Sequence, residues 1–91
     1  MVKFVLEAHL EDPDNEGFEK DLGGEYFYKM YDWSVLPSLG HMVDVVGTYC
    51  QVSSIYHDLE GEEKLIKVMV LVNDPEYNSF PEDPSWNKKV G

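Results

Sequence analysis

The stretch VKFVLEAHL, residues 2–10, decides the fold of this chain. Its apolar residues fall at every second position, from Val2 through Phe4 to Leu10. A period of two is that of a β-strand with one buried face. We therefore expect the first strand over residues 2–10.

Two further strands are expected before the middle of the chain. Residues 26–33, YFYKMYDW, are aromatic enough to favour a strand, although apolar residues on both faces leave a helix open. Residues 41–46, HMVDVV, form a short β-branched run that Gly47 ends. These runs alternate with turn-forming residues, as in a sheet of short strands.

Residues 48–57 and 64–72 have the pattern of a hairpin. The apolar positions of the first run shift phase across Ser53 and Ser54, which predicts a β-bulge there. Residues 59–63, LEGEE, have the composition of the connecting turn. The second run, KLIKVMVLV, is apolar on both faces, so we expect both faces of that strand to be covered.

The last 19 positions, residues 73–91, read as an irregular C-terminal arm. Prolines alternate with aromatic residues there: Pro75, Tyr77, Phe80, Pro81, Pro84 and Trp86. Proline cannot donate to a strand ladder, so we expect the aromatic residues to attach the arm to the β domain or to a partner. The fold class expected is mainly β: residues 1–72 form one small antiparallel curled sheet or barrel of about five strands, with at most one short helix, because small sheets must hide their edges.

Composition limits the function. The 91 residues allow one small domain. Eighteen acidic residues face seven lysines and no arginine, giving a net charge of -11. Because phosphate binding depends on clustered Lys and Arg, direct nucleic-acid binding is disfavoured. The 43% hydrophobic content is too high for a wholly disordered chain.

Cysteine content and hydropathy indicate a compartment. Cys50 is the single cysteine, so no internal disulfide forms and a reducing compartment is expected. Glu7 interrupts the N-terminal apolar run before it reaches the length of a secretion signal. The longest apolar run, residues 68–72, is far below the roughly 20 residues that span a bilayer. We expect a soluble cytoplasmic protein without membrane contact.

Acidic residues gather in two loops. The first loop, residues 11–25, has a local charge of -6, and the second cluster follows residue 57. Acidic loops often serve solubility alone. The alternative is that spaced carboxylates imitate nucleic-acid phosphates and bind a basic partner, with nearby aromatic residues as apolar anchors. The candidate partner-binding residues are Glu11, Asp12, Asp14, Glu16, Glu19, Asp21, Tyr26, Tyr28, Trp33, Asp58, Glu60, Glu62 and Glu63.

No cofactor, metal site or catalytic residue is expected. Residues 12–17 begin like a calcium loop, but position twelve is Gly23 where a bidentate glutamate is needed. His57 has only Asp58 close by in sequence, and neighbours on a strand point to opposite faces. Cys50 lies among strand residues with apolar neighbours, which indicates a structural thiol rather than a nucleophile. A bound metal, or a polar pocket holding His57 and Asp58, would revive an enzymatic interpretation.

Residues 37–59, PSLGHMVDVVGTYCQVSSIYHDL, carry a resemblance. A proline and a glycine precede a short strand, a second glycine turns the chain, and a longer strand ends near a histidine. This pattern resembles small phage and mobile-element proteins with an SH3-like β-barrel. The resemblance implies that fold and a phage origin, and it assigns no functional residue. Barrels of this kind also bind extended peptides through an aromatic groove flanked by acids, a composition that residues 26–33 share with the acidic loop beside them.

Two functions follow as expectations. The first is a small acidic macromolecule-binding protein: a phage-encoded inhibitor that occupies the basic nucleic-acid-binding surface of a host defence or processing enzyme in the host cytoplasm. The alternative is a structural or assembly accessory protein, such as a small virion component. Its arm of residues 73–91 would dock on a neighbouring subunit, so a homo-oligomer is expected there.

Overall fold

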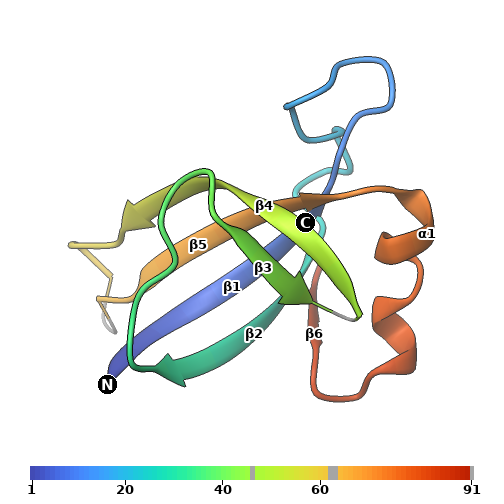
Figure 1. Cartoon of the computed structure of the whole chain (residues 1–91). Coiled ribbons are helices and arrows are strands. Elements are labelled where there is room, and N and C mark those ends of the chain that lie inside the picture. The colour runs from blue at the N-terminus through green and yellow to red at the C-terminus, as the bar shows by residue number, and fades with distance from the viewer. Residues whose placement is uncertain (46, 62–63, 91) are drawn as a thin grey trace.

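β1 (Val2–Leu10) lies at the centre of a curled sheet in a computed structural model that describes residues 1–45, 47–61 and 64–90 (Figure 1). It pairs antiparallel with β2 and parallel with β5. The sheet order is β3-β4-β5-β1-β2-β6, and the curl gives a half-barrel. The other elements are β2 (Tyr26–Trp33), β3 (Met42–Val45), β4 (Thr48–His57), β5 (Ile66–Val72), helix α1 (Asp74–Tyr77), a 3-10 turn (Phe80–Glu82) and β6 (Asn87–Lys89).

The fold class expected from the sequence is confirmed, with two additions. A mainly β, curled sheet with one short helix is present, and residues 26–33 form a strand rather than a helix. The sheet has six strands instead of about five, because residues 87–89 of the arm pair with β2. The β1–β5 pair is parallel, so the sheet is mixed. The described part of the chain contains no helix with the length and apolar character needed to cross a membrane.

The bulge expected at Ser53 or Ser54 is confirmed. The pairing of β4 with β5 is irregular between Val52 and Ser54, and the Ser53 hydroxyl donates to the Met69 carbonyl at 3.2 Å. The extra residue restores the inward direction of the apolar side chains that follow it, since strand side chains alternate between faces. The phase shift in the sequence therefore reports a real irregularity in the sheet.

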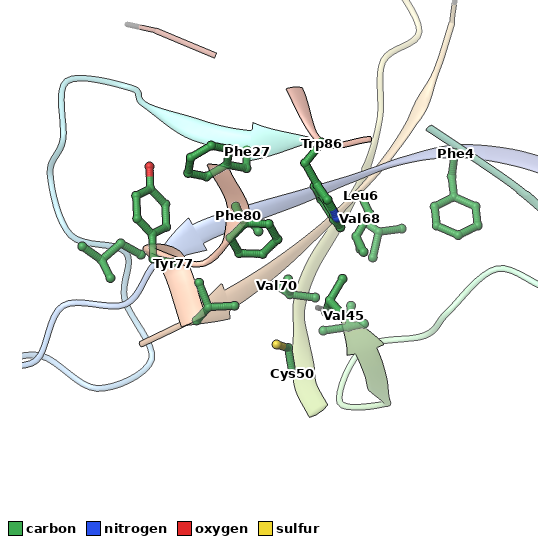
Figure 2. Close-up of a cluster of buried hydrophobic side chains, with 14 residues drawn as sticks. Phe4, Leu6, Phe27, Val45, Cys50, Val68, Val70, Tyr77, Phe80 and Trp86 are labelled. Carbon is green, nitrogen blue, oxygen red and sulfur yellow. The ribbon is translucent and has the colours of Figure 1, made fainter. Parts of the chain in front are cut away.

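The hydrophobic core fills the inside of the curl (Figure 2). Strands β1, β4 and β5 contribute Leu6, Val52, Val68 and Val70 among others. The arm of residues 73–91 contributes its three large aromatic side chains, Tyr77, Phe80 and Trp86. Phe80 has no exposed surface and stacks on Phe27 of β2, with 5.2 Å between ring centroids. The aromatic residues of the arm thus attach it to the chain's own sheet.

The expectation of one buried face for β1 is wrong. Val5, Glu7 and His9 point away from the core, yet all three are buried. Side chains from β2, from β4 and from the acidic loop cover its outer face: Tyr26 stacks on His9, Tyr56 donates to Glu7, and Glu19 lies against His9. Two of these three residues, Glu7 and His9, are ionisable, and both belong to the candidate site described next.

Candidate functional site

The acidic loop, residues 11–25, is an ordered hairpin that projects from the C-terminal end of β1 (Figure 1). Glu11 and Glu19 face each other in an isolated antiparallel bridge. The Glu11 amide donates to the Val72 carbonyl at 2.8 Å, and the Asp12 amide donates to the Phe18 carbonyl at 2.9 Å. The loop is therefore hydrogen-bonded both to the sheet and across itself.

Several loop carboxylates hold the loop's own backbone. Asp12 Oδ1 accepts from the Asp14 amide at 2.9 Å, and Asp21 Oδ1 accepts from the Gly23 amide at 3.0 Å. Glu11 Oε2 accepts from the amide of Gly17, whose φ of 87° is a left-handed value that suits glycine. Asp-x-Asp and Asp-x-Gly are sequence signals for such Asx turns. Three of the predicted partner-binding acids thus have structural roles inside the loop.

Two other carboxylates, Asp14 and Glu16, project from the tip of the loop. Both are exposed, and their side chains take part in no hydrogen bond or ion pair with the residues that the structure describes. Phe18 follows them in the same loop, and its side chain is 63% exposed. Sequence reasoning missed Phe18. The sequence signal that marks Phe18 is that it is the one aromatic residue in a loop with seven acidic residues.

Glu19 ties the loop to the outer face of the sheet. Its Oε2 lies 2.6 Å from His9 Nδ1, and His9 Nε2 lies 3.0 Å from Glu7 Oε1. Each ring nitrogen of His9 therefore faces a carboxylate oxygen. The His9 ring also stacks on Tyr26, with 4.5 Å between centroids. The result is a Glu7–His9–Glu19 chain that joins β1 to the loop.

Glu7 is the buried member of this chain, only 2% exposed. Burial alone raises the pKa of Glu7. Hydrogen bonds from His9 and from the Tyr56 hydroxyl, at 2.9 Å, together with the charges of His9 and Lys67, outweigh the burial and leave that pKa below its usual value. Burial and the bond to Glu7 raise the pKa of Tyr56, so its hydroxyl stays a neutral donor. The group is an ionised carboxylate satisfied by protein donors.

Tyr26 and Tyr28, both on β2, lie beside the Glu7–His9–Glu19 side chains. Tyr28 pairs directly with Glu7, and the two tyrosine rings meet edge to face with centroids 6.1 Å apart. Both rings are half-buried. The structure therefore brings Tyr26 and Tyr28 next to the acidic loop, as the sequence predicted, while leaving part of each ring accessible.

Helix α1 adds acids to the same end of the sheet. It begins directly after β5, whose last residue Val72 bonds to Glu11, so α1 and the loop leave the sheet at one end (Figure 1). The helix carries Asp74 and Glu76 in its first turn. We call this end, made of the acidic loop and α1, the acidic end. Its helical acids were not among the predicted site residues because the arm was expected to be irregular.

The second predicted acidic cluster lies at the opposite end of the sheet. Asp58 and Glu60 follow β4, next to the Phe4–Ile66 pairing, whereas the acidic loop follows the Leu10–Val72 pairing. Phe4 and Leu10 are six residue steps apart along β1, or about 20 Å at about 3.3 Å per step. Asp58 Oδ1 accepts from the Gly61 amide at 2.8 Å and so closes the turn. Glu62 and Glu63 lie outside the described residues. Asp58 and Glu60 therefore do not form one surface with the acidic loop.

Trp33 is likewise far from the acidic loop. It pairs with Val2 at the opposite end of β1, and its side chain is 53% exposed. It lines an open groove of about 750 Å³ between β2, β3 and residues 34–41. We call this hollow the apolar groove. Its lining is Phe4, Leu6, Tyr31, Asp32, Trp33, Val35, Leu36, Pro37, Ser38, His41, Met42, Val43 and Asp44.

Cys50, His57 and Asp58 are the residues that an enzymatic interpretation would use. In the described part of the chain, no three His, Cys, Asp or Glu side chains converge as metal ligands. Burial, followed by the charges of Glu76 and Asp44, raises the pKa of the Cys50 thiol to about 11. His57 and Asp58 are adjacent at the end of β4 and the start of its turn.

Comparisons with known protein families, with curated proteins and with solved structures find no match to this chain.

Proposed function

We propose that this protein binds a macromolecule with a basic surface through its acidic end, and that it acts as a phage-encoded inhibitor covering the nucleic-acid-binding surface of a host enzyme. The observation that carries the proposal is the ordered acidic loop, which presents Asp14 and Glu16 at its tip. The resemblance of residues 37–59 to small phage proteins supports the assigned origin.

Charge gives the first step of binding. The net charge of -11 attracts a basic partner from a distance and orients its approach, an effect that salt weakens. The loop is already hydrogen-bonded to the sheet, so its carboxylates are held apart before the partner arrives. A preorganised charge pattern costs little conformational entropy on binding.

Apolar contact gives the second step. Exposed ion pairs contribute little affinity, and most interfaces depend on a few buried aromatic anchors. Phe18 projects from the loop, and Tyr26 and Tyr28 flank its base. We assign Phe18 as the principal anchor, with the two tyrosines at the edge of the contact. Trp33, Asp58 and Glu60 lie too far away to join the same interface.

The test is capture of a partner from bacterial lysate on immobilised protein. The double substitution Asp14→Lys and Glu16→Lys reverses two charges that make no internal bond, so the loop keeps its structure. The control, Glu60→Lys with Glu82→Lys, makes the same charge change at exposed positions away from the loop. We expect the loop variant alone to lose the partner, and we expect added double-stranded DNA or RNA to displace the partner from the wild type.

Phe18→Ala separates specific binding from bulk attraction. We expect affinity for the captured partner to fall about tenfold or more, as for an interface anchor, with the thermal unfolding midpoint unchanged. Equal loss in the loop and control variants would reduce the effect to net charge. Capture that survives high salt, or a partner that nucleic acid fails to displace, would contradict the proposal.

A further inference from the structure

The apolar groove lies where the half-barrel stays open. Tyr31, Asp32 and Trp33 are consecutive in β2, and Met42, Val43 and Asp44 are consecutive in β3, and all six line the groove. Successive strand side chains point to opposite faces, so a groove touched by three in a row runs along a strand edge rather than over a face. The groove therefore follows two strand edges.

Both edges lack a partner within the described residues. β3 is the terminal strand of the sheet and pairs with β4 alone. β6 pairs with β2 only at Tyr26 to Tyr28, so the part of β2 from Tyr31 to Trp33 has β1 on one side and the groove on the other. Open edges carry unpaired amides and carbonyls that accept an added strand. An extended peptide segment would fit between these two open strand edges.

The chemistry of the groove selects what fills it. Phe4 and Leu6 form its floor, while Trp33, Val35 and Met42 are each more than half exposed at its mouth. A volume of about 750 Å³ lies within the roughly 300–1,000 Å³ of ligand-binding sites. Large apolar side chains on one face of an extended segment would cover these exposed residues.

Charge favours a cationic occupant over a second copy of this chain. Asp32 and Asp44 stand on the two opposed strands, and no lysine is among the described lining residues. Lys3 lies opposite Asp32 in the β1–β2 register, but the two form no ion pair among the described residues. His41 is the one lining residue able to carry positive charge, and its Nδ1 accepts from the Ser38 amide at 3.4 Å. A second copy would bring another charge of -11, whereas lysine or arginine beside the apolar residues would pair with both aspartates.

We propose that the apolar groove is a second binding site, separate from the acidic end, for an extended partner segment that alternates large apolar residues with lysine or arginine. The segment adds a strand along β3, places its apolar side chains over Phe4 and Leu6, and pairs its cations with Asp32 and Asp44. The proposal is independent of the inhibitor function, because its residues lie at the other end of the sheet.

The probe is a short capped peptide that alternates lysine with isoleucine or phenylalanine. One control peptide carries glutamate in place of lysine, and a second carries serine in place of the apolar residues. We expect calorimetry to detect binding of the first peptide only. Exposed Trp33 should shift its emission to shorter wavelength, while buried Trp86 should not respond. Trp33→Phe should abolish the shift and retain binding.

Matched variants locate the site. Asp32→Asn with Asp44→Asn should weaken binding about three- to tenfold, the sum expected of two exposed ion pairs. Asp14→Asn with Glu16→Gln changes the net charge equally at the acidic end and should leave binding unchanged. Val35→Ser with Met42→Ser should weaken binding about tenfold. Both of the latter side chains are exposed, so thermal unfolding should be unaffected and serves as the check on folding.

Several results would overturn the proposal. The glutamate peptide binding as well as the lysine peptide would remove the role of the aspartates. Binding of the serine peptide, weakened equally by the groove and loop substitutions, would reduce the effect to bulk charge. A concentration-dependent shift of Trp33 emission with dimers in sedimentation, in the absence of peptide, would assign the apolar groove to a second copy of the chain.

Discussion

At the scale of single residues, Glu7 is the most constrained ionisable group of the molecule. It is almost fully buried, and Tyr56 and His9 direct their polar atoms to the same carboxylate oxygen. Glu7→Gln keeps the size and one acceptor but removes the charge that pairs with His9. We expect the variant to lose about 1–3 kcal/mol in the free energy of unfolding, measured by urea denaturation at about pH 7. Glu60→Gln, at an exposed position, should lose almost nothing.

The Glu7 carboxylate also sets the direction in which the free energy of unfolding changes with pH. Because the folded-state pKa of Glu7 lies below that of the unfolded chain, its contribution is present above the unfolded value, about 4.3, and is lost as the pH falls through the folded value. The difference in unfolding free energy between wild type and Glu7→Gln should therefore shrink in acid. A difference that grows in acid would contradict the assigned direction.

Cys50 is a second residue whose behaviour follows from burial. Its side chain is 5% exposed, and burial raises the thiol pKa to about 11, so little thiolate forms near neutral pH. We expect a thiol reagent such as dithiobis-nitrobenzoate to react slowly with the folded protein and rapidly in urea. Fast reaction in the absence of urea would show that β4 opens readily.

At the scale of elements, the C-terminal arm places its large aromatic side chains in the chain's own core. Phe80 is fully buried between Phe27 and Trp86, with centroids 5.2 and 4.8 Å away. Phe80→Ala should lower the free energy of unfolding by about 3–5 kcal/mol, a large part of the roughly 5–15 kcal/mol of a typical domain. Leu59→Ala, at a residue 75% exposed, is the matched control and should change little.

The packing of the arm in the core also makes a prediction about the alternative function, an assembly protein. If residues 73–91 docked on a neighbouring subunit, their removal would leave a folded monomer. Because Tyr77, Phe80 and Trp86 pack in the chain's own core, we expect the truncated chain to unfold instead, as circular dichroism would record. A folded truncated chain would favour the assembly function.

The strands could be predicted where the information is local. Alternation located β1, and the phase shift at Ser53 located the bulge, because both are set by neighbours in sequence. The parallel β1–β5 pair could not be predicted, since no local pattern states which strands become neighbours. The burial of Glu7 could not be predicted either, because it depends on Tyr56, which is distant in sequence.

The candidate site was predictable in part for the same reason. The acidic loop and its flanking tyrosines are contiguous in sequence and lie together in space. Asp58 and Glu60 shared the composition of the loop but not its location, because chain direction in the sheet places them at the other end. The apolar groove combines residues from three segments and was visible only once the curl of the sheet was known.

At the scale of the whole molecule, charge repulsion opposes folding. Eighteen carboxylates face seven lysines, and within the described residues ion pairs join His9 to Glu7 and Glu19, and Lys88 to Glu25. Added sodium chloride screens the repulsion, so we expect the thermal unfolding midpoint to rise. Relief of about 1 kcal/mol would raise it by about 4–8 °C for a chain of this size. A midpoint that falls with salt would mean that attractive pairs dominate.

The central position of β1 has a consequence for synthesis. This strand is made well before its parallel partner β5, since Phe4 pairs with Ile66. The entropy cost of bringing β1 and β5 together must be met before their contacts stabilise the pair. Folding is therefore slow, on the order of milliseconds to seconds, as in other sheets dominated by distant pairings. Until residues 66–72 are made, β1 can pair with β2 alone, and its other edge stays open. Chaperones that bind extended apolar segments have their best access to this protein during that interval.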